Sequence, residues 1–197
     1  MQNLYKSILI YGPPGSGKGT ISKALNLSDS VTHVSTGDIF RGIDPSSEKG
    51  KMINNYLKKG NLLPDDFTLD IWHEFVKHKI NEGIYDPKEH FLLLDGIPRT
   101  LKQSILLEKY IKVEYIIVLE MKDLDKLIAR MENRALTENR SDDLDKNVLK
   151  NRIDIYLNDT TKILKHYSND KIFNFNANQK KLEVIRDVLM KFAPIVS

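Results

Sequence analysis

A glycine-rich segment near the start of the chain carries the clearest chemistry in the sequence. Residues 12–20 read Gly-Pro-Pro-Gly-Ser-Gly-Lys-Gly-Thr and stand between an apolar, strand-like run and a helix-like segment. Glycines there let backbone N–H groups point inward around an anion, and the start of a helix adds positive potential. The lysine can reach the outer phosphates. The segment therefore predicts a phosphate-binding loop, with contacts from Gly15, Ser16, Gly17, Lys18, Gly19 and Thr20.

The last residues of this loop separate it from the commonest loops of its kind. The common pattern places a serine or threonine directly after the lysine, where its hydroxyl ligates magnesium. Here Gly19 takes that place and Thr20 follows. The ending Gly-Lys-Gly-Thr is typical of nucleoside monophosphate kinases, and the whole chain resembles that family, adenylate kinases in particular. Mg²⁺ would then be held mainly by phosphates and water, which suits an ion that dehydrates reluctantly.

Five short apolar runs are expected to form the strands that position these residues. Longer segments with helical spacing separate them, and this alternation favours a parallel sheet with helices on both faces. Runs such as Phe-Leu-Leu-Leu are continuous, as expected for parallel strands buried on both sides. We therefore expect an α/β, three-layer P-loop kinase fold whose five-stranded parallel sheet covers residues 7–11, 33–35, 91–94, 115–120 and 171–175.

Two segments fit the expected sheet poorly. Residues near 38–68 carry short helical patterns that glycines and prolines interrupt, and residues 134–145 are polar and aperiodic. Plain loops are the simpler interpretation, and mobile flaps that cover a substrate are the sharper one. By resemblance we expect a single domain, residues 1–197, with an insertion that binds the nucleoside monophosphate at about 35–64 and a short lid at about 133–144.

Three segments match the pattern by which the resembled family holds its acceptor, AMP. The first reads Ser-Thr-Gly-Asp-Ile-Phe-Arg, in which Thr36 would bond the nucleotide and Arg41 its phosphate. Asp38 also suits a capped helix start, and the two interpretations can hold together. The second reads Gly-Asn-Leu-Leu-Pro and would border the adenine and ribose of AMP, although alone it is an ordinary helix-ending turn. Its bordering residues are Asn61, Leu62 and Leu63.

The third segment reads Leu-Asp-Gly-Ile-Pro-Arg-Thr and follows a central strand. Asp95 stands at the carboxyl end of that strand, where parallel sheets bind ligands, and its carboxylate would orient a water bound to magnesium. Gly96 allows close approach, and the guanidinium fork of Arg99 matches phosphate oxygens. The family usually has Phe at the position of Ile97, a change that keeps an apolar side chain. The resemblance places these residues and Pro98 beside AMP.

Two residues favour adenine as the base of the acceptor. Gln103 offers an amide that can pair with the N6 amine and a ring nitrogen of adenine, although on an exposed helix face it would simply be solvated. Thr36 is the residue of adenylate kinases, whereas relatives that act on UMP and CMP typically carry Ala there and Asn in place of Thr100. The sequence therefore favours AMP, with a UMP/CMP kinase as the nearest alternative.

Basic residues recur along one side of an amphipathic helix expected around residues 124–131. A solvated basic face would explain them, but with the arginines that follow they resemble the lid of adenylate kinases, which closes on the transferring phosphoryl group. The arginines that match the lid pattern, on this helix and after it, are Arg130, Arg134, Arg140 and Arg152. The glycines usual in short lids are missing, and the interval from Arg140 to Arg152 is one residue longer than usual. Gln179 is expected beside the donor adenine.

Composition bounds the remaining possibilities. The chain has 197 residues, a formal net charge of +3 and no cysteine, which argues against disulfides and against the zinc site of long-lid relatives. No apolar run approaches the roughly 20 residues that cross a bilayer. The net charge is weaker than nucleic-acid binders usually show. We therefore expect a cytoplasmic monomer without membrane or nucleic-acid partners.

The resemblance implies reversible, Mg²⁺-dependent transfer of the terminal phosphoryl group of ATP to AMP, giving two ADP. Such transfer needs in-line placement and charge neutralisation, and no general base, because the acceptor phosphate is already an anionic nucleophile. A non-catalytic nucleotide-binding switch is the alternative from another class, but it has no use for paired acceptor arginines. Catalysis would rest on Lys18, Asp95, Arg99, Arg130, Arg134, Arg140 and Arg152.

Overall fold

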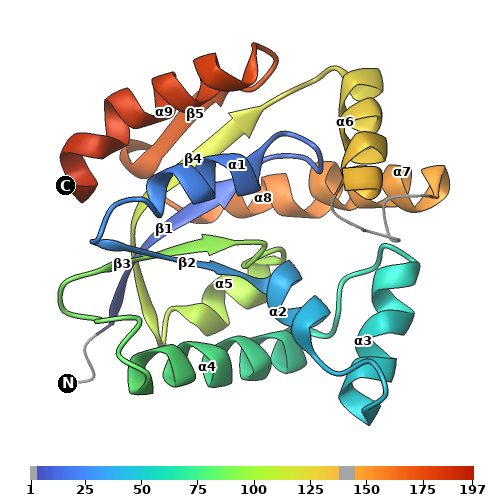
Figure 1. The fold of residues 1–197 in the computed structure, drawn as a ribbon, viewed down its shortest axis with the longest axis horizontal. Helices are drawn as coiled ribbons and strands as arrows, with labels where there is room; N and C mark the ends of the chain where they lie inside the picture. The colour runs from blue at the N-terminus through green and yellow to red at the C-terminus, as the bar shows by residue number, and fades with distance from the viewer. Residues whose placement is uncertain (1–3, 138–144) are drawn as a thin grey trace.

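A parallel sheet forms the centre of the protein in a computed structural model that describes residues 4–137 and 145–197 (Figure 1). Its strands lie in the order β2-β3-β1-β4-β5, and every neighbouring pair is parallel. The expected five-stranded parallel sheet is thereby confirmed. The strands are β1 (Tyr5–Tyr11), β2 (Val31–Ser35), β3 (Phe91–Asp95), β4 (Ile111–Glu120) and β5 (Ile172–Asn176).

Helices connect these strands and cover both faces of the sheet (Figure 1). After α7 the chain continues through a π-helical turn (Tyr156–Thr160), the short α8 (Thr161–Ile163) and two 3-10 turns (Leu164–His166 and Asn169–Lys171). The longer helices are α1 (Lys18–Leu25), α2 (Thr36–Gly42), α3 (Glu48–Lys58), α4 (Asp65–Asn81), α5 (Leu101–Leu107), α6 (Leu124–Thr137), α7 (Lys146–Ile155) and α9 (Lys181–Val196). Among the described residues, no helix is both long and apolar enough to span a membrane.

Successive residues of β1 point into two different hydrophobic cores. Ile8 and Ile10 pack with α1, α6, α7 and α9, whereas Leu9 and Tyr11 pack with α2, α4, α5 and α8. A strand buried on both faces has no polar side, which is why it is a continuous apolar run in the sequence. The two cores on either side of one sheet confirm the predicted three-layer arrangement.

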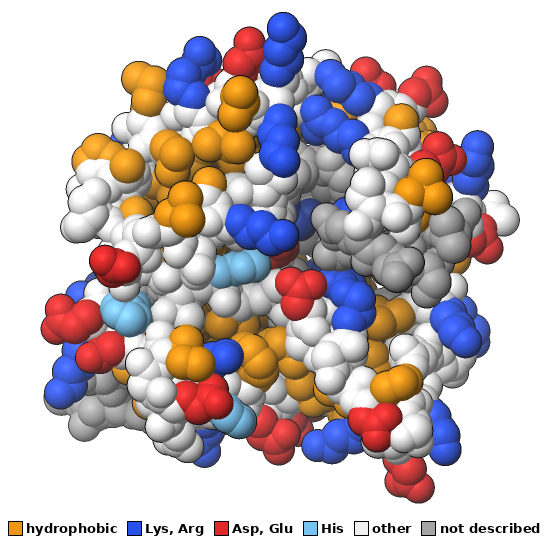
Figure 2. All heavy atoms as spheres, viewed as in Figure 1, with side chains coloured by type: hydrophobic (Ala, Val, Ile, Leu, Met, Phe, Trp, Pro, Cys, Tyr) orange, Lys and Arg blue, Asp and Glu red, His pale blue; other side chains and the backbone are white. Residues whose placement is uncertain are grey.

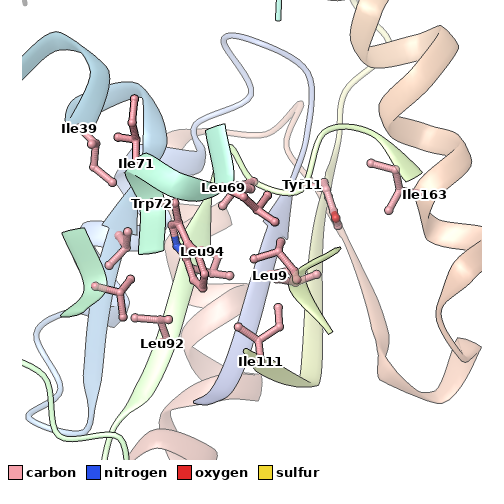
Figure 3. Packing of buried hydrophobic residues seen from close by; sticks show 14 of the residues in the cluster. Leu9, Tyr11, Ile39, Leu69, Ile71, Trp72, Leu92, Leu94, Ile111 and Ile163 are labelled. Atoms are coloured by element: carbon pink, nitrogen blue, oxygen red, sulfur yellow. The ribbon is translucent and has the colours of Figure 1, made fainter. Parts of the chain in front are cut away.

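Trp72 anchors α4 on the sheet. Its side chain is fully buried and lies over the strands beside Leu92 and Leu94 (Figure 3). The ring of Tyr110 meets the indole edge-on, with 6.0 Å between the ring centroids. Removing an aromatic side chain of this size from water contributes about 2–3 kcal/mol. The anchored helix begins at Asp65, so its first residue is held at the same edge of the sheet as the candidate site.

All five strands differ from the expected limits, because polar residues at their ends interrupt the apolar runs. β1 begins at Tyr5 rather than at residue 7, and β3 extends by one residue to Asp95. β4 begins at Ile111 rather than at residue 115, and its first half carries Lys112 and Glu114, which pair at 2.6 Å. β2 begins at Val31 rather than at residue 33, since Thr32 is polar. β5 is shifted by one residue, to Ile172–Asn176. An apolar-run criterion finds the doubly buried middle of a strand and misses ends that face solvent.

Candidate active site

A cavity of about 830 Å³ opens at the carboxyl ends of the strands, between α1, α6 and the loop after β3. Figure 2 shows the surface hollowed near the middle of this face, with Lys and Arg side chains around the hollow. The predicted phosphate loop forms one wall. Within the described part of the chain, the cavity is lined by these predicted site residues: Gly15, Ser16, Gly17, Lys18, Gly19, Thr20, Arg41, Leu62, Asp95, Gly96, Pro98, Arg99, Arg130, Arg134 and Arg152.

The phosphate loop ends in the first turn of α1. Gly17 precedes that helix with a left-handed backbone (φ +100°) and has no side chain to cap it. Lys18 curls back over the loop, where its Nζ donates to the carbonyl oxygens of Gly12 (2.8 Å) and Pro13 (3.3 Å). The hydroxyl of Ser16 is buried without a hydrogen-bond partner among the described residues. An uncapped helix start beside a lysine and a buried hydroxyl suits an anion.

Burial makes the Lys18 ammonium unusually acidic. Its pKa is lowered from 10.5 to about 8, mainly because burial disfavours the charged form. Asp95 opposes the shift, while Arg99, Arg134 and Arg152 add to it. More positive than negative charge therefore converges on this amine, and a polyanion in the cavity would relieve the repulsion.

Asp95 lies near the middle of the sheet edge formed by the carboxyl ends of the strands. It ends β3, opposite Ile10 on β1 and Ser35 on β2. The next residue, Gly96, has φ +85°, and an ideal Cβ there would lie 2.6 Å from Oγ1 of Thr36. Thr36 in turn donates to the carbonyl oxygen of Asp95 at 3.4 Å. Glycine is therefore required where the loop after β3 approaches the side chain of Thr36 at the start of α2.

Two arginines face the acceptor side of the cavity. Nε of Arg99 donates to the carbonyl oxygen of Gly96 at 2.9 Å. Burial lowers the pKa of Arg99 to about 10, Arg152 and Arg41 add to the shift, and Asp95 opposes it. Arg41 pairs with Asp38 at 2.5 Å. Asp38 lies in the first turn of α2 but does not cap it, because the capping oxygen is that of Ser35, the preceding strand's last residue.

A second, smaller cavity of about 50 Å³ adjoins the first and shares lining residues with it. Gln103 lines it and is only 2% exposed, so the solvated alternative for this residue is wrong. Arg41, Arg99 and Arg152 line both cavities. The other predicted site residues in its wall are Thr36, Asn61, Leu62, Leu63 and Gly96.

The predicted lid arginines lie on two helices. Arg130 on α6 donates to the carbonyl oxygens of Ala177 (3.2 Å) and Gln179 (3.4 Å), which fixes it against the loop before α9. Arg134 and Arg152 line the large cavity from α6 and α7. Arg140 lies outside the described residues, as does most of the predicted lid.

Two predicted site residues within the described part of the chain do not line either cavity. Ile97 is 2% exposed and belongs to the core shared with α2 and α4. The side chain of Gln179 donates to Asp187 on α9 at 2.5 Å, and the backbone of Gln179 is the part that touches Arg130.

Three further cavity residues had no signal in the sequence analysis. His33 on β2 has a buried Nε2 with no partner among the described residues, and burial lowers its pKa against the opposing effects of Asp95 and Asp38. Tyr156 and Thr160 reach the wall from the π-helical turn after α7. The π-helical turn sets which of its side chains face the cavity, and the ordinary helical periodicity of about 3.6 residues does not predict this.

A metal site built from protein side chains alone is absent from the described residues, which contain no group of three or more His, Cys, Asp or Glu suited to hold an ion. Asp38 and Asp95 both line the large cavity; Asp38 pairs with Arg41, and Asp95 ends the strand beside the phosphate loop. A single carboxylate together with nucleotide phosphates and waters fits Mg²⁺, which keeps several waters in such sites.

Comparisons with known proteins agree with this geometry. The family model described as "Adenylate kinase" matches residues 10–172. Adenylate kinase from Flavobacterium psychrophilum is 35% identical over 85% of this chain and 87% of its own length. The adenylate kinases of Desulforamulus reducens (33% identical, 93% of this chain and 98% of its own length) and Ureaplasma parvum (32%, 92% and 95%) are similar throughout. The chain therefore belongs to the adenylate kinase family, whose members transfer a phosphoryl group from ATP to AMP.

Proposed function

We propose that the two connected cavities hold ATP and AMP end to end, and that the arginines between them stabilise the phosphoryl group in transit. The observation that carries this proposal is that Arg41, Arg99 and Arg152 line both cavities. A guanidinium at the junction can contact the phosphates of either nucleotide. Such sharing is needed for direct transfer and has no purpose in a protein that only binds one nucleotide.

The donor lies in the phosphate loop in this proposal. Backbone N–H groups from Gly15 to Thr20 surround the β- and γ-phosphates, and Lys18 leaves its loop carbonyls to reach them. Arg130 and Arg134 neutralise charge that spreads over the equatorial oxygens of the transferring group. The backbone at Gln179, already in contact with Arg130, borders the donor base.

The acceptor lies in the smaller cavity and at its mouth. Arg41 and Arg99 hold the AMP phosphate in line with the γ-phosphate, because two guanidinium groups fix both its position and its orientation. Gln103 reads the adenine. The remaining wall of the acceptor site is formed by Thr36, Asn61, Leu62, Leu63, Gly96 and Pro98, with Ile97 supporting it from the core.

Asp95 would hold Mg²⁺ through a coordinated water. When bound, the ion would supply neutralisation of charge on the nucleotide phosphates. No general base is needed, because the phosphate of AMP is itself the nucleophile. The protein's own task is placement, exclusion of water and neutralisation of charge.

The segment of residues 35–64 and the lid of residues 133–144 are proposed to close over the two substrates. The proposed lid begins within α6 and ends before α7, and Glu132 on α6 pairs with Lys146 on α7 at 3.4 Å. Closure would bring Arg140 and Arg152 to the phosphates and exclude water. The net charge of +3 supports small nucleotides as partners rather than nucleic acid. That the protein works as a monomer in the cytoplasm stays a prediction.

A coupled assay with ATP as donor and AMP, GMP, UMP or CMP as acceptor tests the proposal. We expect ADP formation to be fastest with AMP, with little turnover of either pyrimidine nucleotide. Preference for UMP or CMP would support the pyrimidine-kinase alternative. Two adenosines linked by five phosphates should bind tightly to a two-site enzyme. Weak binding of that bisubstrate, with no turnover of any acceptor, would overturn the proposal in favour of a nucleotide-binding switch.

A further inference from the structure

Asp65 joins the acceptor side chains from a helix that was not expected to take part in the site. It is the first residue of α4, and one oxygen of its carboxylate, Oδ1, accepts two hydrogen bonds. The hydroxyl of Thr100 donates to it at 2.9 Å, and Nε2 of Gln103 donates at 2.9 Å. The Thr100 hydroxyl oxygen also accepts from the backbone N–H of Gln103 at 3.1 Å. These contacts form one closed network.

The network fixes which way the amide of Gln103 points. A carboxylate only accepts hydrogen bonds, so the amide atom that faces Asp65 must be the nitrogen. On its other side, Oε1 of Gln103 accepts from the backbone N–H of Arg99 at 2.7 Å. A flipped amide would set oxygen against carboxylate and N–H against N–H. Two repulsive contacts in a side chain that is 2% exposed make the flipped orientation strongly unfavourable.

In this fixed orientation the amide of Gln103 has one donor and one acceptor left to bind a nucleobase. Each of its atoms has one bond within the protein, so one N–H of Nε2 and one lone pair of Oε1 remain. Adenine offers a donor at its 6-amine and an acceptor at N1. A 6-oxopurine reverses both, since it carries a carbonyl at position 6 and an N–H at N1. An amide that cannot flip therefore accepts adenine and rejects the 6-oxopurines.

We propose that Asp65 is a positioning residue that sets base choice by fixing the amide of Gln103. The proposal rests on the proposed function, in that it takes the smaller cavity as the acceptor site. Asp65 acts through Gln103 and Thr100 and does not itself contact a substrate. A hydrogen-bond acceptor at Oδ1 is the property that matters, and the negative charge is secondary.

Three variants separate these properties. Asp65→Ala removes the acceptor. Asp65→Asn keeps an amide oxygen that can accept from both Thr100 and Gln103 but removes the charge. Asp66→Ala is the matched control, because Asp66 is the next residue of the same first turn, is 70% exposed and pairs only with Lys102 in the described contacts. It loses the same charge beside the helix start without touching Gln103.

The measurements are kcat/KM for AMP and for IMP with saturating ATP, the KM for ATP, and the dissociation constants of AMP and IMP. For Asp65→Ala we expect the AMP-to-IMP ratio of kcat/KM to fall about tenfold, which is the effect of one lost hydrogen-bonding orientation. The KM for ATP should stay within about twofold. Asp65→Asn should keep most of the ratio, and Asp66→Ala all of it.

The outcomes distinguish this inference from the proposed function. An unchanged AMP-to-IMP ratio in a folded Asp65→Ala variant overturns the role of Asp65 while AMP turnover by the parent protein still supports the function. Equal losses in Asp65→Ala and Asp66→Ala would make the effect one of helix charge, which also overturns it. If the parent does not phosphorylate AMP but the variant still loses preference for AMP binding, the function fails and the positioning role stands. Melting temperatures of all variants establish that they are folded.

Discussion

Gly96 approaches Thr36 so closely that no side chain fits between them. A Cβ on Gly96 would lie 2.6 Å from Oγ1 of Thr36 and 3.0 Å from Nη2 of Arg99. Both neighbours belong to the proposed acceptor site, and the backbone of Gly96 has φ +85°, which other residues adopt at a cost of about 1–2 kcal/mol. The contact therefore ties the loop after β3 to the start of α2.

Gly96→Ala should damage acceptor binding more than it damages the fold. The methyl group would displace Thr36 and Arg99, so we expect kcat/KM for AMP to fall at least about tenfold, in keeping with an overpacked contact of 1–3 kcal/mol. The matched control is Gly83→Ala: Gly83 also has positive φ (+70°), but its Cβ would meet nothing within 4 Å. Steady-state kinetics and thermal unfolding of both variants make the comparison. Equal losses of kcat/KM for AMP in the two variants would attribute the loss to backbone strain and not to the contact with Thr36.

Arg99→Ala should abolish most AMP-dependent turnover while ATP still binds. Arg99 lies at the junction of the cavities with Nε held by Gly96, so loss of its fork removes charge-assisted bonds to the acceptor phosphate. Two such bonds predict a fall of roughly 100-fold or more in kcat/KM for AMP. Arg99→Lys keeps the charge without the fork and should recover only part of the activity. Titration with an ATP analogue gives the donor affinity; an equal loss there would contradict an acceptor role.

The pKa of Lys18 predicts that ATP binding takes up protons. In the free protein the pKa is about 8, because burial and nearby arginines disfavour the charged amine. Phosphates favour the charged amine, so binding raises the pKa, and between pH 8 and the new value the complex holds more protons than the free protein. ATP affinity should therefore fall as pH rises above 8, approaching roughly tenfold per pH unit.

Calorimetry in two buffers of different ionisation enthalpy at pH 8.5 measures this uptake directly. Lys18→Met keeps the length of the side chain and should show none of the Lys18-linked uptake. A Lys18→Met variant with the same proton uptake as the parent would assign the linkage to another group, of which Arg99, with a pKa of about 10, is the nearest candidate.

The sequence predicted the parts of the site whose signal is local. The phosphate loop needs only nine consecutive residues, and Asp95 and Arg99 stand within five residues of each other after one buried strand. The fold followed from apolar runs because both faces of the sheet are covered. Strand ends were less accurate, since residues such as Lys112 alternate with apolar ones on an exposed edge.

Features that depend on contacts between distant segments could not be predicted. Asp65 is 38 residues from Gln103 in sequence, and an acidic residue after a proline at the start of a helix indicates only a favourable charge there. The buried state of Gln103 likewise follows from α4 packing over α5. Gln179 is expected beside the donor adenine from the sequence, but its contact with Asp187 on α9 depends on how that helix packs, so it could not be predicted.

Asn151 on α7 should hold the acceptor segment against the arginine-bearing helix. Its side-chain amide donates to the carbonyl oxygen of Lys59 (2.9 Å) and to Oδ1 of Asn61 (3.0 Å). Between these acceptors, a Cβ on Gly60 would lie 3.0 Å from the carbonyl oxygen of Val148, so the two backbones are already close. Asn151 precedes Arg152, and both walls of the acceptor cavity meet at this contact.

We therefore expect Asn151→Ala to raise the KM for AMP by about three- to tenfold, as two hydrogen bonds worth about 0.5–1.5 kcal/mol each are partly replaced by water. The KM for ATP should change little, because the phosphate loop lies on the other side of the cavity. Asn147→Ala, an exposed position one turn earlier on α7, is the control. Hydrogen exchange at residues 60–63 should become faster in Asn151→Ala alone. Unchanged exchange there, with an unchanged KM for AMP, would mean that the close packing at Gly60 suffices to join the two segments without the amide.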